Sequence, residues 1–244
     1  MSFIQVINPN TNLSITKTID QVVRSTITSG TKILVVCAKQ GVPSIEGHFD
    51  EAVATIGVLE QIKNGEKKGI DGHIIACFGD PGLLAARELV RAPVIGIAEA
   101  AMHTATLIAK RFSIIGTLSR NLSIAKSLLQ QYGFSNHCTA MHSIELPVLA
   151  LTEDKSGSAR EKIRQCCIKV KNKDKSGAII LGCSGMALLA QELTKELDLP
   201  VIDGVSAAVK ILEGLLGLGL TTSKHVDFDF PLKKSLTGIF ENLN

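Results

Sequence analysis

Two stretches of the chain repeat one pattern: HIIACFGDPGLLAARELV at His73–Val90, and AIILGCSGMALLAQELTKEL at Ala178–Leu197. In each stretch, an apolar run of strand length ends at a cysteine, Cys77 or Cys183, and a short turn containing glycine follows. Apolar residues then recur at three- and four-residue spacing, which is typical of an amphipathic helix. The pattern predicts, twice over, a buried strand that leads through a cysteine-bearing turn into a helix.

The rest of the chain repeats at nearly the same offset. Cys183 follows Cys77 by 106 residues (183 − 77), and Pro200 follows Pro93 by 107 (200 − 93). The segment FIQVINPNT from residue 3 matches FSIIGTLS from residue 112, an offset of 109 (112 − 3). A near-constant offset predicts a duplicated α/β unit with parallel sheets, divided into residues 1–110 and residues 111–244.

Composition excludes several classes of protein. Of the 244 residues, 45% are hydrophobic and 20% are charged, which is ordinary for a globular protein with a sizeable core. A net charge of +3, one tyrosine and no tryptophan argue against nucleic acid or a membrane as the partner. The start of the chain has no signal-peptide pattern, and six cysteines in a chain of this length are no disulfide scaffold. We therefore expect a cytoplasmic protein with free thiols.

Two further turns lie where parallel strands are expected to end, which is where parallel sheets bind ligands. The first, Asn8-Pro9-Asn10-Thr11, either forms a turn with Asn10 or Thr11 as helix N-cap, or brings Asn8 and Asn10 to a ligand. The second, residues 41–47 with Ser44 and Ile45, is either a turn or a wall of the same pocket.

Three other local features lead to expectations. Asp80 and Pro81 are suited to be the N-cap and first residue of the helix after Cys77. Glu99 and His103, four residues apart on one helix, form either an acid/base pair or a surface pair. The tail is expected to end in a short helix around residues 232–240.

A cysteine between a parallel strand and a helix lies where backbone N–H groups converge and the helix dipole is positive. Both effects favour the thiolate. If Cys77 and Cys183 face each other across a cleft, one thiolate can remove a proton from a carbon acid while the opposite thiol returns one. The backbone of Phe78-Gly79 and Ser184-Gly185 would stabilise the enolate oxygen. This arrangement predicts a racemase.

Other interpretations of the cysteines stay open. A metal site would need more converging ligands, and neither repeat contains a CxxC or HxxxH spacing. A redox disulfide between Cys77 and Cys183 would require the cleft to close to bonding distance. A non-catalytic, two-lobed protein that binds a small ligand would not need two matched cysteines. Cys37 and Cys138 are expected to be structural thiols.

The motifs VINPNT, GVPSIEGHFDEA, IACFGDPGLLAARE, GIAEAAM, LGCSGM and PVIDGVSAAV span nearly the whole chain. With them the sequence resembles the aspartate/glutamate racemase superfamily, and within it the hydantoin/allantoin racemase family, most closely the bacterial allantoin racemases.

The resemblance implies an isomerase without cofactor or metal, built of two three-layer α/β domains related by pseudo-two-fold symmetry, with the active site between them. It implies that Cys77 and Cys183 are the acid/base pair and that Thr117, with the residues beside the cysteines, binds substrate. The substrate would be a small cyclic ureide, allantoin or alternatively a 5-substituted hydantoin. The resemblance further implies a homo-oligomer and a C-terminal tail that packs on the first domain.

Overall fold

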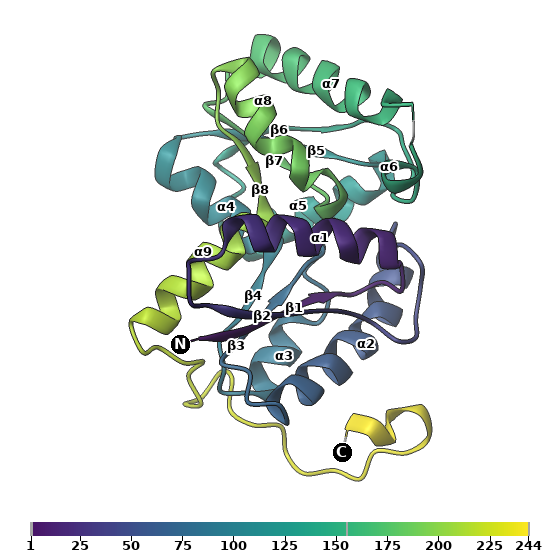
Figure 1. Cartoon of the computed structure of the whole chain (residues 1–244), viewed down its shortest axis with the longest axis vertical. Helices are drawn as coiled ribbons and strands as arrows, with labels where there is room; N and C mark the ends of the chain where they lie inside the picture. The colour runs from purple at the N-terminus through teal and green to yellow at the C-terminus, as the bar shows by residue number, and fades with distance from the viewer. Residues whose placement is uncertain (1, 155, 244) are drawn as a thin grey trace.

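The computed structural model describes residues 2–154 and 156–243 and contains two four-stranded sheets in which every pairing is parallel (Figure 1). The strand order is β2-β1-β3-β4 in the first sheet and β6-β5-β7-β8 in the second, so the two halves share one topology. The predicted α/β fold with two similar parallel sheets is confirmed. The strands are β1 (Phe3–Asn8), β2 (Lys32–Cys37), β3 (Gly72–Ile75), β4 (Val94–Gly96), β5 (Phe112–Gly116), β6 (Cys138–Ser143), β7 (Ala178–Leu181) and β8 (Val201–Asp203).

Helices follow most strands, as expected for right-handed parallel crossovers. The predicted division after residue 110 falls between α4 and β5. The α-helices are α1 (Leu13–Thr26), α2 (His48–Glu66), α3 (Leu83–Leu89), α4 (Ile97–Ile108), α5 (Leu122–Gln131), α6 (Ala150–Glu153), α7 (Ser158–Asp174), α8 (Ala190–Leu197) and α9 (Gly204–Gly217). Short 3₁₀ segments are η1 (Ser119–Asn121), η2 (Ser184–Leu189) and η3 (Gly238–Leu243).

The two sheets share one apolar core. Its buried side chains come from one face of each sheet and from α1, α4, α5 and α9, which form the layer between the sheets (Figure 1). The opposite face of the first sheet packs against α2 and α3, and that of the second sheet against α7 and α8. Each sheet is therefore covered on both faces, which explains why the β3 and β7 segments are buried at every position.

The helices α4 and α9, which follow the fourth strand of each half, meet where the halves join. A Cβ atom at Gly204, the first residue of α9, would lie 2.3 Å from the carbonyl oxygen of Ile97, the first residue of α4. Only a glycine allows this approach of the two backbones. The start of α9 is thereby positioned against the start of α4.

Two predicted helix N-caps are wrong. The N-cap of α1 is Asn12, whose side chain accepts a 2.9 Å hydrogen bond from Ile15 N–H. Asn10 cannot cap the helix because its Oδ1 accepts hydrogen bonds from Asn8 Nδ2 and Asn12 N–H. Helix α3 begins at Leu83 rather than at Pro81, because the chain first makes a left-handed turn at Gly82 (φ 73°).

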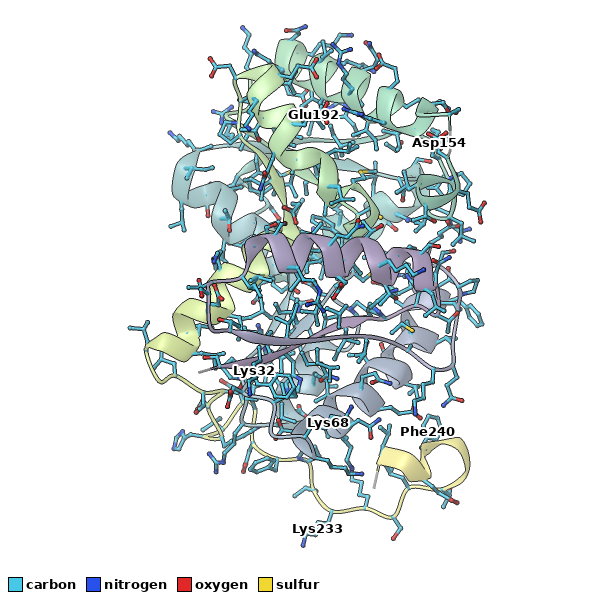
Figure 2. The ribbon with its side chains drawn as sticks, in the orientation of Figure 1. Lys32, Lys68, Asp154, Glu192, Lys233 and Phe240 are labelled. Carbon is cyan, nitrogen blue, oxygen red and sulfur yellow. The ribbon has the colours of Figure 1, made fainter. Side chains whose placement is uncertain are left out.

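The C-terminal tail returns to elements of the first half. Thr222 N–H and Oγ1 donate to the carbonyl oxygens of Arg91 and Ala92, and Lys224 Nζ donates to the carbonyls of Arg87 and Glu88. The predicted helix over residues 232–240 is wrong, because only η3 forms there. Leu232 is 82% exposed and so lacks the buried apolar contacts that stabilise a short helix. Figure 2 shows Lys233 on this loop, pointing away from the body of the protein.

Candidate active site

Cys77 and Cys183 occupy equivalent places in the two halves. Each lies two residues beyond the carboxyl end of a central strand, β3 for Cys77 and β7 for Cys183. Both residues line one cavity of about 60 Å³. The folding of the two repeats into neighbouring units thus brings together two thiols that are 106 residues apart in the sequence (183 − 77).

Both halves contribute to the wall of this cavity, which is mostly apolar. The first half supplies Asn10, Ile15, Ile45, Ala76, Phe78 and Gly79 beside its cysteine. The second half supplies Ile114, Gly116, Thr117, Asn121, Leu122, Ile124, Ala125, Val148, Gly182 and Ser184 beside its own.

The environment of the two sulfurs differs from the prediction. Burial raises the pKa of Cys183 to about 11 and raises that of Cys77 further, and a negative charge on Cys183 would raise the Cys77 pKa again. The N–H groups of Gly79 and Gly185 hydrogen-bond to the sulfurs and lower these pKa values, but by less than burial raises them. The expectation that the strand–helix junction favours the thiolate is therefore wrong.

Burial outweighs any effect of the helix starts. Helix α3 begins only at Leu83, so Cys77 lies outside its first turn, whereas Cys183 is the N-cap of η2, the 3₁₀ segment that leads into α8. Around the sulfurs the cavity wall is mostly apolar, which disfavours a charged thiolate. All six cysteines are free thiols, so Cys77 and Cys183 form no disulfide in this structure.

The two asparagines in the turn after β1, Asn8 and Asn10, have different roles. Asn10 lines the cavity, whereas the fully buried Asn8 lies outside its wall. Asn8 Nδ2 donates to Asn10 Oδ1 (2.9 Å), to the carbonyl of Asn12 (3.1 Å) and to Thr16 Oγ1 (3.0 Å). Asn8 therefore holds the turn in place, and Asn10 is the residue that a ligand would meet.

Some of the other residues predicted to contact substrate line the cavity, and others do not. Ile45, Phe78, Gly79, Thr117 and Ser184 all line the cavity. Ser44 and Gly185 are outside the wall. A Cβ atom at Gly185 would lie 3.6 Å from Cys183 Sγ, so this glycine is next to the sulfur although it does not line the cavity.

Glu99 and His103 do not reach the cavity. Glu99 forms an ion pair with Arg87, and the ring of His103 packs edge-on against Phe134 with 4.9 Å between ring centroids. Each of the two residues is paired with a side chain other than its expected partner, so neither interpretation fits this placement. Asp80 does not cap α3; its carboxylate accepts hydrogen bonds from Ala98 and Glu99 N–H (3.0 and 2.9 Å) at the start of α4.

No residue of η1 or α5 was predicted to line the cavity, yet four do: Asn121, Leu122, Ile124 and Ala125. The repeat contained the signal. At the offset of 109, Ile15 on α1 corresponds to Ile124 on α5 (124 − 109 = 15), and both residues line the cavity.

Residues 2–154 and 156–243 contain neither a metal-binding cluster nor a membrane-spanning helix. Within these ranges no cluster of three or more histidine, cysteine, aspartate or glutamate side chains could hold a metal ion. None of the helices in the same ranges combines the length and the hydropathy needed to cross a bilayer.

Comparison with known proteins identifies relatives along the whole chain. The family model described as Asp/Glu/hydantoin racemase matches residues 4–212. The solved allantoin racemase from Klebsiella pneumoniae is 64% identical, with a TM-score of 0.98, over 100% of this chain and 99% of that one. The allantoin racemase from Pseudomonas fluorescens is 34% identical, with a TM-score of 0.90, over 97% and 100%. A hydantoin racemase from Pseudomonas sp. (strain NS671) is 42% identical over 98% of this chain and 96% of its own length. The chain therefore belongs to the Asp/Glu/hydantoin racemase family.

Proposed function

We propose that this racemase interconverts (R)- and (S)-allantoin by two-base proton transfer between Cys77 and Cys183, in the catabolism of purine-derived ureides. The observation that carries the proposal is the placement of two free thiols, from equivalent strand ends, on one small cavity. The 64% identity to the allantoin racemase of Klebsiella pneumoniae supports allantoin as the substrate.

In the proposed reaction, one cysteine enters the step as thiolate and the other as thiol. The thiolate takes the proton from the asymmetric ring carbon, and the electron pair of that C–H bond becomes the enolate of the adjacent ring carbonyl. The second thiol then donates its proton to the opposite face of the carbon and is left as thiolate. For the other enantiomer the two cysteines exchange roles.

The protein's own groups supply what this step needs. Asn10 and residues beside each cysteine line the cavity, and in the proposed reaction they hydrogen-bond the ring carbonyls, whose oxygen becomes more negative in the transition state. The apolar wall keeps water from the carbanion and from the thiolate, which strengthens both the base and these hydrogen bonds. Since the two thiols supply both proton transfers, we propose that no cofactor takes part. The cytoplasmic location and the homo-oligomer stay predictions.

A second candidate substrate is a 5-substituted hydantoin. The aliphatic side chains of Ile45, Leu122, Ile124 and Val148 line the cavity, and such a wall suits an alkyl or aryl substituent better than a ureido group. The 42% identity to a hydantoin racemase also supports this alternative.

The test follows optical rotation and isotope exchange together. Each enantiomer of allantoin, 5-isobutylhydantoin and 5-benzylhydantoin is incubated with the protein in D₂O beside an enzyme-free blank. We expect the rotation of allantoin to decay to zero while deuterium replaces the hydrogen on the asymmetric carbon. A larger kcat/KM for the hydantoins would favour the second candidate. Binding of these compounds with neither inversion nor exchange above the blank would instead show a ligand-binding protein.

A further inference from the structure

The side chain of Asn121 has an unused acceptor at the cavity. Asn121 lines the cavity, and its Nδ2 donates a 3.2 Å hydrogen bond to Thr117 Oγ1, another lining residue. Its Oδ1 is buried and has no hydrogen-bond partner among the residues that the structure describes. A buried amide oxygen without a donor is unfavourable, and such atoms in native proteins call for an explanation.

Asn12, the equivalent asparagine of the first half, shows the structural role that an asparagine at this position can take. At the offset of 109, Asn121 corresponds to Asn12 (121 − 109 = 12), and each residue immediately precedes an α-helix. Asn12 has an extended backbone, and its Oδ1 accepts the Ile15 N–H. Asn121 has a helical backbone (φ −77°, ψ −18°) because it is the last residue of η1, and its side chain makes no capping hydrogen bond.

Asn121 and Thr117 together present an acceptor beside a donor. Because Thr117 Oγ1 accepts the hydrogen bond from Asn121, the proton of its hydroxyl group is left to donate. An amide that is cis within a five-membered ring presents its N–H and its C=O on one edge. This edge is the complement of the pair formed by Asn121 Oδ1 and the Thr117 hydroxyl.

We propose that Asn121 Oδ1 accepts a ring N–H of the cyclic ureide while the Thr117 hydroxyl donates to the adjacent ring carbonyl. Asn121 is then a specificity-determining residue that selects substrates with an unsubstituted ring amide. This inference rests on the proposed function, since it assumes a cyclic ureide in the cavity. The ring amide edge is common to allantoin and to 5-substituted hydantoins, so the same contact serves either substrate.

The test compares 5-isobutylhydantoin with its 1-methyl and 3-methyl derivatives, in which one ring N–H at a time is replaced. In the wild-type protein we expect one of the two derivatives to lose about 10- to 100-fold in kcat/KM, since the acceptor is then left unpaired. Asn121→Ala removes the acceptor and makes room for the methyl group. It should reduce the rate with the parent compound and remove most of the discrimination against the methylated one.

Asn12→Ala is the matched control, because it removes the same amide at the equivalent helix start outside the cavity wall. It should lower the melting temperature through loss of the α1 cap and leave the discrimination ratio unchanged. The inference is overturned if wild-type protein racemises all three hydantoins equally well, or if Asn121→Ala keeps the wild-type ratio. If instead the wild-type protein racemises no cyclic ureide, it is the proposed function that fails.

Discussion

The phenolic hydroxyl of Tyr132 donates a 2.8 Å hydrogen bond to Asp80 Oδ2 and so links the end of α5 to the turn that follows Cys77. The same carboxylate accepts the N–H groups of Ala98 and Glu99 at the start of α4. One buried carboxylate thus connects three elements from both halves of the chain beside a cysteine of the cavity. Burial raises the pKa of Asp80 to about 7, against the lowering effect of these three hydrogen bonds.

Tyr132→Phe should cost more stability at pH 8 than at pH 5. The folded-state pKa of Asp80 is raised from 3.8 to about 7, so its carboxyl group is ionised at pH 8 and largely protonated at pH 5. The Tyr132 hydrogen bond favours the ionised form, and its loss should lower the free energy of unfolding at pH 8 by about 1–2 kcal/mol. Urea denaturation at the two pH values measures this difference. An equal loss at both would contradict an ionised Asp80 as the acceptor.

Cys77→Ser and Cys183→Ser should each abolish racemisation, because a serine hydroxyl is a far weaker acid than a thiol and cannot replace it in either proton transfer. Polarimetry with either enantiomer of allantoin measures the loss. Cys37→Ser and Cys138→Ser are the controls: both are free thiols outside the cavity wall and should keep most of the activity. A wild-type rate in either cavity variant would exclude the two-base mechanism.

The sequence repeat predicted more than the fold class. The offset between Cys77 and Cys183 predicted two similar units with parallel sheets, because buried strands and glycine-containing turns are determined by local pattern. The meeting of the two cysteines was only a condition of the predicted mechanism, since they follow strands of different sheets and meet because those sheets face each other.

What failed depended on contacts between distant segments. Asp80 was expected to cap the helix next to it, but its carboxylate caps α4, whose first residue is 17 positions further along (97 − 80). The pKa of Cys183 was expected to be lowered, but it is raised because apolar side chains from both halves enclose the sulfur. Neither result can be read from local sequence, since each requires knowing which distant residues pack there.

The activity should increase with pH across the neutral range. The two-base reaction starts from a protein with one thiolate and one thiol, and burial raises the pKa of both cysteines, that of Cys183 to about 11. At pH 6 the thiolate form is therefore scarce, and kcat/KM should rise about tenfold per pH unit up to the first apparent pKa of the pair. Initial rates between pH 6 and pH 9 test this. A flat profile would show that a thiolate is already present at pH 6.

Gly204→Ala should destabilise the protein, whereas Gly214→Ala in the same helix should not. A Cβ atom at Gly204 would lie 2.3 Å from the Ile97 carbonyl oxygen, a backbone atom that cannot move without shifting α4. Overpacking of this kind costs about 1–3 kcal/mol, equivalent to a fall of roughly 2–12 °C in melting temperature. Gly214 is an exposed residue in the interior of α9, and no atom lies within 4 Å of the place that an alanine methyl group would take there. Alanine at this position should therefore be neutral or stabilise the helix by up to about 1 kcal/mol.

The same pair of variants tests whether the packing of α9 on α4 positions the two cysteines. Displacing the start of α9 should move β7 and β8 relative to β3, since α4 and α9 each contact strands of both sheets. Gly204→Ala should therefore lower kcat/KM for racemisation even at temperatures where it is fully folded, while Gly214→Ala keeps the wild-type value. Equal activity in the two folded variants would show that the cavity tolerates a shift between the halves. That outcome would contradict the two-base mechanism, which requires an exact separation of the two thiols.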